Sequence, residues 1–153
     1  MSSCCFLSRR KAMAEQICPE TGHPMVRDVR PMTISYKGHS IEVDMPGWYC
    51  EHCGEAVHLG KDMLISDRAL NRLKAEVDGL LLPETVKRIR KRLKLTQRDA
   101  GTIIGGGPNA FQKYESGDVL VSKAVASALL LLDDHPEGLS VLKSREADRH
   151  VAA

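Results

Sequence analysis

Two cysteines separated by two residues, Cys50 and Cys53, form the pattern with the clearest chemical use in this sequence. A turn can bring two thiolates in this spacing onto one zinc ion, and Gly54 permits the tight turn that this needs. A zinc ribbon requires a second pair about thirty residues away, across a hairpin. At that place the sequence has Cys18, followed by Thr21 where the partner cysteine is expected.

Two interpretations of these cysteines remain open. In the first, His23 replaces the missing cysteine, and one Zn2+ is held by Cys18, His23, Cys50 and Cys53. In the second, the unit folds without metal and the three cysteines are small buried hydrophobes beside Trp48. A catalytic role lacks comparable support, because no spacing pairs a thiol with a base. No lysine or arginine adjoins Cys50 to lower its pKa.

A second set of candidate residues belongs to a short polar helix that is expected after a run of three glycines. Phe111 and Tyr114 lie three residues apart and are predicted to face the core, which leaves Asn109, Gln112 and Lys113 pointing outward. Asparagine and glutamine can pair with adenine N6 and N7, and lysine can donate to guanine O6 and N7. A glycine-containing turn between two such helices is typical of a helix-turn-helix.

The charge distribution favours a nucleic-acid surface in the same region. The chain carries a net charge of +2, but residues 83–114 hold 8 basic and 2 acidic side chains. Thr96 and Gln97 open the helix before the glycine run, where side chains and free backbone N–H groups can hold a phosphate. The glycines are not a P-loop, because Gly107 is followed by Pro108 rather than by lysine.

These residues must be positioned by an α+β fold. Apolar and polar residues alternate from Met25 to Met45 around a turn at Lys37-Gly38, which predicts a β-hairpin. From Ser66, a predicted N-cap, leucines recur at helical spacing until a break near residue 82. Five short helices are then expected, opened in turn by Pro83, Thr96, Pro108, Ser122 and Leu139.

The composition of the 153 residues is that of a folded soluble chain. No apolar run approaches the about 20 residues of a membrane span, and the N-terminus lacks the apolar core of a secretory signal, so we expect a cytoplasmic protein. The expected organisation is a disordered leader (1–16), a β-rich, zinc-ribbon-like unit (17–62), a linking helix (63–82), a helix-turn-helix and dimerisation domain (83–143), and a C-terminal tail (144–153). Translation starts at Met1 or at Met13.

Residues 17–143 resemble the MqsA antitoxins, which combine a YgiT-type zinc finger with a five-helix, Xre-type (lambda-repressor-like) helix-turn-helix domain. The stretch VKRIRKRLKLTQRDAGTIIGGGPNAFQKYESG is close to the family signature. The stretches ICPETG and DMPGWYCEHCGE fall where the family carries its zinc pairs, and Thr21 departs from the expected cysteine.

The resemblance implies a bacterial type II antitoxin, which is not an enzyme. Such proteins form homodimers through the C-terminal domain and repress their own operon by binding a palindromic double-stranded operator. Their N-terminal domain neutralises a toxin, typically an mRNA-cleaving ribonuclease. By this resemblance Asn109 and Lys113 read bases, although the family usually has arginine in place of Lys113. The phosphate-holding residues are then Thr96, Gln97, Lys91 and Arg98.

Two other functions fit parts of the sequence. A stand-alone Xre-type transcriptional regulator would use the N-terminal unit to sense metal or redox state, and would have no neighbouring toxin gene. A metal-dependent enzyme or thiol oxidoreductase would need an exposed thiol of low pKa.

Overall fold

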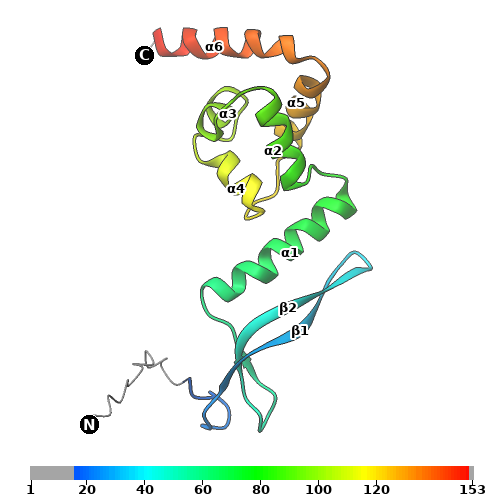
Figure 1. Ribbon diagram of the computed structural model, residues 1–153, viewed down its shortest axis with the longest axis vertical. Helices are drawn as coiled ribbons and strands as arrows, with labels where there is room; N and C mark the ends of the chain where they lie inside the picture. The colour runs from blue at the N-terminus through cyan, green and yellow to red at the C-terminus, as the bar shows by residue number, and fades with distance from the viewer. Residues whose placement is uncertain (1–15, 152–153) are drawn as a thin grey trace, which may run out of the picture.

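The computed structural model describes residues 16–151, and side chains up to residue 148. The expected leader therefore lies outside the described residues except for Gln16, as does the question of the start codon. The described part consists of a β unit, a long connecting helix and a cluster of helices, stacked in that order (Figure 1). No helix in it is long and apolar enough to cross a membrane.

The β unit is a three-stranded antiparallel sheet of β1 (Val26–Tyr36), β2 (His39–Tyr49) and β3 (Ala56–Val57), in that order. The expected hairpin is confirmed: β1 pairs with β2 along its whole length, and Tyr36 lies opposite His39. Lys37 and Gly38 form the two-residue turn with φ of 47° and 81°. Positive φ at both residues matches the twist of the flanking strands.

The connecting helix α1 (Lys61–Asp78) begins five residues before the predicted N-cap at Ser66. The reason is a contact that is distant in sequence. Asp62 is buried in the first turn, accepts two hydrogen bonds from the Arg27 guanidinium at 2.6 and 2.7 Å, and also accepts the backbone N–H of Leu59. The predicted break is confirmed, because α1 ends at Gly79 in a left-handed conformation.

The helical domain contains the five α-helices expected from the sequence. They are α2 (Pro83–Arg92), α3 (Gln97–Ile103), α4 (Ala110–Ser116), α5 (Lys123–Asp134) and α6 (Leu139–Val151), with a 3-10 turn η1 (Pro136–Gly138) before the last. The predicted caps at Thr96 and Ser122 are confirmed, since each hydroxyl accepts a backbone N–H. Helix α4 starts two residues later than predicted, because Asn109 is its N-cap and Pro108 belongs to the preceding turn.

The glycine run fixes the close approach of α3 to the turn before α4. Gly105, Gly106 and Gly107 all have positive φ. Gly107 donates a hydrogen bond to the carbonyl of Gly101, and a Cβ atom on Gly101 would lie 2.0 Å from the Gly107 oxygen. Only glycine fits at position 101, so the angle at which α4 leaves the turn depends on it.

Helix α1 also joins the β unit to the helical domain (Figure 1). Its amide at Asn71 donates to the carbonyls of Gly117 and Asp118, at 3.0 and 3.1 Å, and Arg68 pairs with the Asp118 carboxylate at 2.7 Å. Gly117 and Asp118 immediately follow α4. Helix α1 is therefore bonded to the chain directly after α4, the helix that the sequence predicts to contact DNA.

Candidate functional site

Two turns with the same backbone hydrogen bonds form one end of the β unit. The amides of Cys18 and Cys50 each donate to the carbonyl five residues later, at 2.9 and 2.8 Å. Their carbonyls each accept from the glycine four residues later, and both glycines have positive φ. Cys18 and Cys50 are thus equivalent positions of two turns, and so are Thr21 and Cys53. Both turns have the local form of a zinc knuckle, including the one without a second cysteine.

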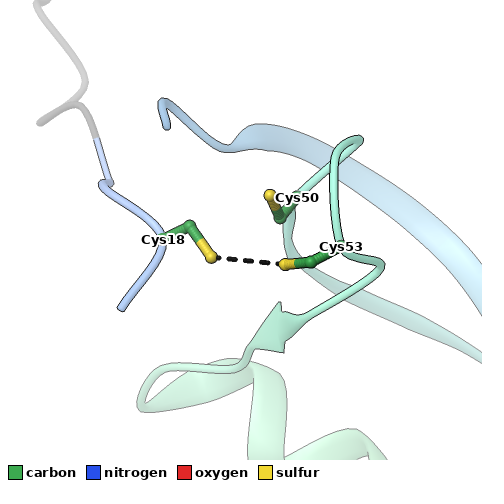
Figure 2. A group of neighbouring side chains, drawn as sticks. All are labelled: Cys18, Cys50 and Cys53. Atoms are coloured by element: carbon green, nitrogen blue, oxygen red, sulfur yellow. Dashed lines mark hydrogen bonds between the residues drawn. The ribbon is translucent and has the colours of Figure 1, made fainter. Parts of the chain in front are cut away.

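The two turns bring three thiols together, as Figure 2 shows. The sulfur atoms of Cys18, Cys50 and Cys53 all lie within 4.8 Å of one another, and those of Cys18 and Cys53 are 3.6 Å apart. Two thiolates on one tetrahedral zinc ion stand about 3.8 Å apart, because each Zn–S bond is about 2.3 Å. The three cysteines therefore form a group that fits a metal ion.

His23, the expected fourth ligand, is not brought to the three thiols. Its ring stacks on that of His52, with centroids 3.9 Å apart and an angle of 24° between the planes. The physical reason lies in the turn: the His23 carbonyl accepts the Cys18 N–H and ends the turn, and from there the His23 ring meets that of His52. The residue at the remaining corner is Thr21, whose Oγ1 lies 3.5 Å from Cys50 Sγ.

The thiols differ in acidity. The pKa of Cys50 is lowered to about 6, first by the hydrogen bond with the Thr21 hydroxyl and next by the backbone N–H of Cys53. The backbone N–H of Glu55 lowers the pKa of Cys53, but desolvation and the neighbouring thiols outweigh it and the net shift is upward. The sequence places no lysine or arginine beside Cys50, and the groups that lower its pKa are a hydroxyl and backbone N–H groups that the two turns bring to it.

In the helical domain, α4 presents the side chains that were predicted to face outward. Asn109, Gln112 and Lys113 are exposed, whereas Phe111 and Tyr114 are buried and pack edge to face with centroids 5.7 Å apart. The predicted two-sided character of this helix is confirmed. Its first turn lines a surface hollow together with residues from the start of α3, namely Gln97, Arg98, Pro108, Asn109 and Gln112.

Two of the residues expected to hold phosphates also have structural partners. The Gln97 amide donates to Glu115 Oε2 at 2.9 Å, and the Arg90 guanidinium binds the same buried carboxylate. Burial acts to raise the pKa of Glu115, but the hydrogen bonds from Arg90 and Gln97 outweigh it and lower it. The hydroxyl of Thr96 accepts the N–H of Asp99 and donates to its carboxylate. The contacts of Arg90 and Gln97 with Glu115 fix α2, α3 and α4 relative to one another.

The basic block of residues 83–114 is divided by its ion pairs. Arg88 and Arg92 both bind Asp133, at 2.9 and 2.8 Å, on the side that faces α5. Lys91 and Arg98 are exposed and, within the described part of the chain, form no ion pair. Their charges are available to a ligand, so the free positive charge is smaller than the sequence count suggests.

Fold and site together define a helix-turn-helix protein with a cysteine-bearing β unit, joined by one helix. Comparison with known proteins is consistent with this class. Residues 15–143 match the family model described as the antitoxin component of a bacterial toxin-antitoxin system, MqsA. The chain is 31% identical over 121 residues to the antitoxin MqsA of Escherichia coli (strain K12). The aligned region covers 78% of this chain and 92% of that protein. The chain belongs to the MqsA antitoxin family.

Proposed function

We propose that this antitoxin binds operator DNA in its own promoter and represses its operon, without catalytic activity of its own. The observation that carries the proposal is the exposed set Asn109, Gln112 and Lys113 on α4. Helices of this type insert their N-terminal residues into the major groove. Asn109 and Lys113 then read bases, while Lys91 and Arg98 neutralise phosphates on either side.

The β unit is proposed to bind and neutralise the toxin, a ribonuclease-type protein, in the cytoplasm. It carries exposed apolar side chains on β1 and at the start of α1, including Val26, Val29, Met63, Leu64 and Ile65. Exposed apolar side chains that gather into a contiguous patch are typical of protein interaction sites.

Zn2+ is the metal proposed for the cysteine cluster. When bound, it would tie the segment around Cys18 to the sheet through Cys50 and Cys53. The need for such a tie is visible in the core, because the buried cluster beside the turns consists of Cys18, Met25 and Cys50. Small cores of this size are commonly supplemented by a structural metal.

The self-association surface is proposed to lie on α5 and α6, so that the chain forms a homodimer through its helical domain. Leu130, Leu131 and Val141 are each more than half exposed. Leu131 and Val141 line an apolar hollow of about 440 Å3 with Ala128 and Leu142. A Leu131→Glu variant should be monomeric by light scattering and should lose the tight, palindrome-dependent component of operator binding.

The experiment for DNA binding is a fluorescence-anisotropy titration with the DNA upstream of the gene and with a scrambled duplex, each at two salt concentrations. Tight binding that depends on the palindrome and falls steeply with salt supports the proposal. Equal, weak binding to both duplexes contradicts it. An Asn109→Ala variant should lose part of this discrimination and remain folded, because the side chain is exposed.

The toxin half is tested by co-purification with the protein encoded beside this gene, followed by an mRNA-cleavage assay. A stable complex that suppresses cleavage supports the antitoxin proposal, and Val29→Glu should weaken it while Asn109→Ala should not. Operator binding without any such complex would instead favour the stand-alone regulator.

A further inference from the structure

Thr21 makes one corner of the cysteine cluster unlike the other three. It occupies the position equivalent to Cys53, and its Oγ1 lies 3.5 Å from Cys50 Sγ. In a tetrahedral zinc site, an oxygen ligand and a sulfur ligand stand about 3.6 Å apart. The distance between the Thr21 hydroxyl and the Cys50 sulfur thus matches that between two ligands of one zinc ion. A neutral alcohol is a much weaker ligand than a thiolate, so this corner is the weak one.

This corner also faces solvent. Cys18 and Cys50 are 1% and 0% exposed, whereas Thr21 and Cys53 are both exposed. Cys18 and Cys50 are buried in a cluster with Met25, against which Trp48 and Val57 pack, so a small molecule can approach the thiols on the side of Thr21.

The surrounding charges select among small molecules. Three thiolates on a divalent ion leave a net charge of −1. The two turns add the exposed carboxylates Glu20, Glu51 and Glu55. An anion would be repelled by this arrangement, while a neutral donor would not.

We propose that the cysteine cluster, holding the zinc ion proposed above, is a three-thiolate centre with an exchangeable fourth position at Thr21. That position takes small neutral donors from solvent, of the class of water or imidazole. The inference rests on the proposed zinc site, but is independent of DNA and toxin binding.

The test is the absorption spectrum of the full chain loaded with one Co2+, in a Cys4→Ser, Cys5→Ser background so that only the cluster supplies thiols. Thr21→Cys should raise metal affinity at least about tenfold in a chelator competition. The sulfur-to-metal band of the Thr21 protein should have about three quarters of the intensity found in Thr21→Cys. Thr33→Cys, an exposed threonine on β1, is the matched control and should change neither quantity.

Exchange is tested by adding neutral imidazole and, separately, azide. Imidazole should shift the visible bands of the Thr21 protein, azide should shift them much less, and neither should act on Thr21→Cys. Thr21→Ala should keep the metal and the imidazole response.

Three results would overturn the proposal. The first is loss of the visible bands in His23→Ala, which would make histidine the fourth ligand. The second is the absence of an imidazole response in the Thr21 protein. The third is metal binding that appears only in Thr21→Cys. The last result would also remove the proposed zinc site. The first two would leave that site intact.

Discussion

The two folded units of this antitoxin are stabilised by different interactions. The helical domain has one core of 13 buried residues, with Phe111, Ile89 and Leu129 fully enclosed. Beside its two turns, the β unit has a buried cluster of three residues, two of which are cysteines, and a buried carboxylate paired with arginine. Apolar burial therefore supports the helical domain. The β unit has fewer buried apolar side chains, among them Met45 and Tyr49, and adds buried thiols that can respond to metal and oxidants.

The largest expected effect is on the helical domain. Phe111→Ala removes a fully buried ring between the helices and should cost about 3–5 kcal/mol of unfolding free energy. Urea unfolding followed by helical circular dichroism reports on this domain. Trp48 is the one tryptophan and lies on β2, so its fluorescence reports on the β unit. The dichroism transition should move to lower urea concentration, and the fluorescence transition should not move. A shift of both transitions would contradict the difference between the two units.

The opposite experiment removes the proposed zinc ion. When the free zinc concentration is 100 times the dissociation constant, removing the zinc ion should lower the unfolding free energy of the β unit by about 3 kcal/mol. A strong chelator should therefore lower the urea midpoint of Trp48 fluorescence and leave the dichroism transition in place. Cys53→Ser without chelator should give the same result, and an unchanged metal content in that variant would refute the cysteine ligands.

A smaller effect separates the two units by function. Asn109→Ala should reduce discrimination between operator and scrambled DNA by about 1–3 kcal/mol, because we propose that its amide reads a base edge. Its affinity for the toxin and its unfolding midpoint should be unchanged. Unaltered discrimination would exclude Asn109 from base reading.

The free cations of the helical domain should differ from its paired ones. Arg98→Ala should weaken binding to all duplexes alike and reduce the slope of log K against log salt by about one unit. Arg88→Ala is the matched control, because Arg88 is already paired with Asp133 and should leave the slope unchanged. Equal effects of the two variants would contradict the division of the basic block.

The smallest effect is the pH dependence of one ion pair, that of Arg27 on β1 with Asp62 on α1. The hydrogen bonds from Arg27 lower the pKa of Asp62 to about 2, below its ordinary value near 4. The folded state holds its proton less tightly than the unfolded state, so this stabilisation is complete above pH 4 and is lost as the pH falls towards 2. The urea midpoint of Trp48 fluorescence should fall over that pH range. In the Asp62→Asn variant it should fall less. An equal acid response in both proteins would argue against the pair.

The parts of this structure that could be predicted are those encoded by neighbouring residues. The hairpin follows from alternation around Lys37-Gly38, and the two faces of α4 follow from the spacing of Phe111 and Tyr114. The start of α1 could not be predicted, because it depends on an ion pair between residues 35 positions apart.

The same limit applies to the candidate site. The positions of Cys18, Cys50 and Cys53 follow from their spacing, but the place of His23 and the partner of Gln97 depend on how chain segments meet in space. The low pKa of Cys50 arises from a hydroxyl 29 residues away in sequence. Patterns of neighbouring residues do not predict contacts between segments that are distant in sequence.

The bonds of Asn71 and Arg68 to the chain after α4 give the connecting helix a thermodynamic role. A partner on the β unit that favours one placement of α1 changes the free energy of placing α4, and DNA on α4 changes the affinity of that partner by the same factor. Asn71→Ala would uncouple the two affinities while leaving each binding surface intact. The contacts of Asn71 and Arg68 are thus the route by which binding at the β unit would change an affinity at α4.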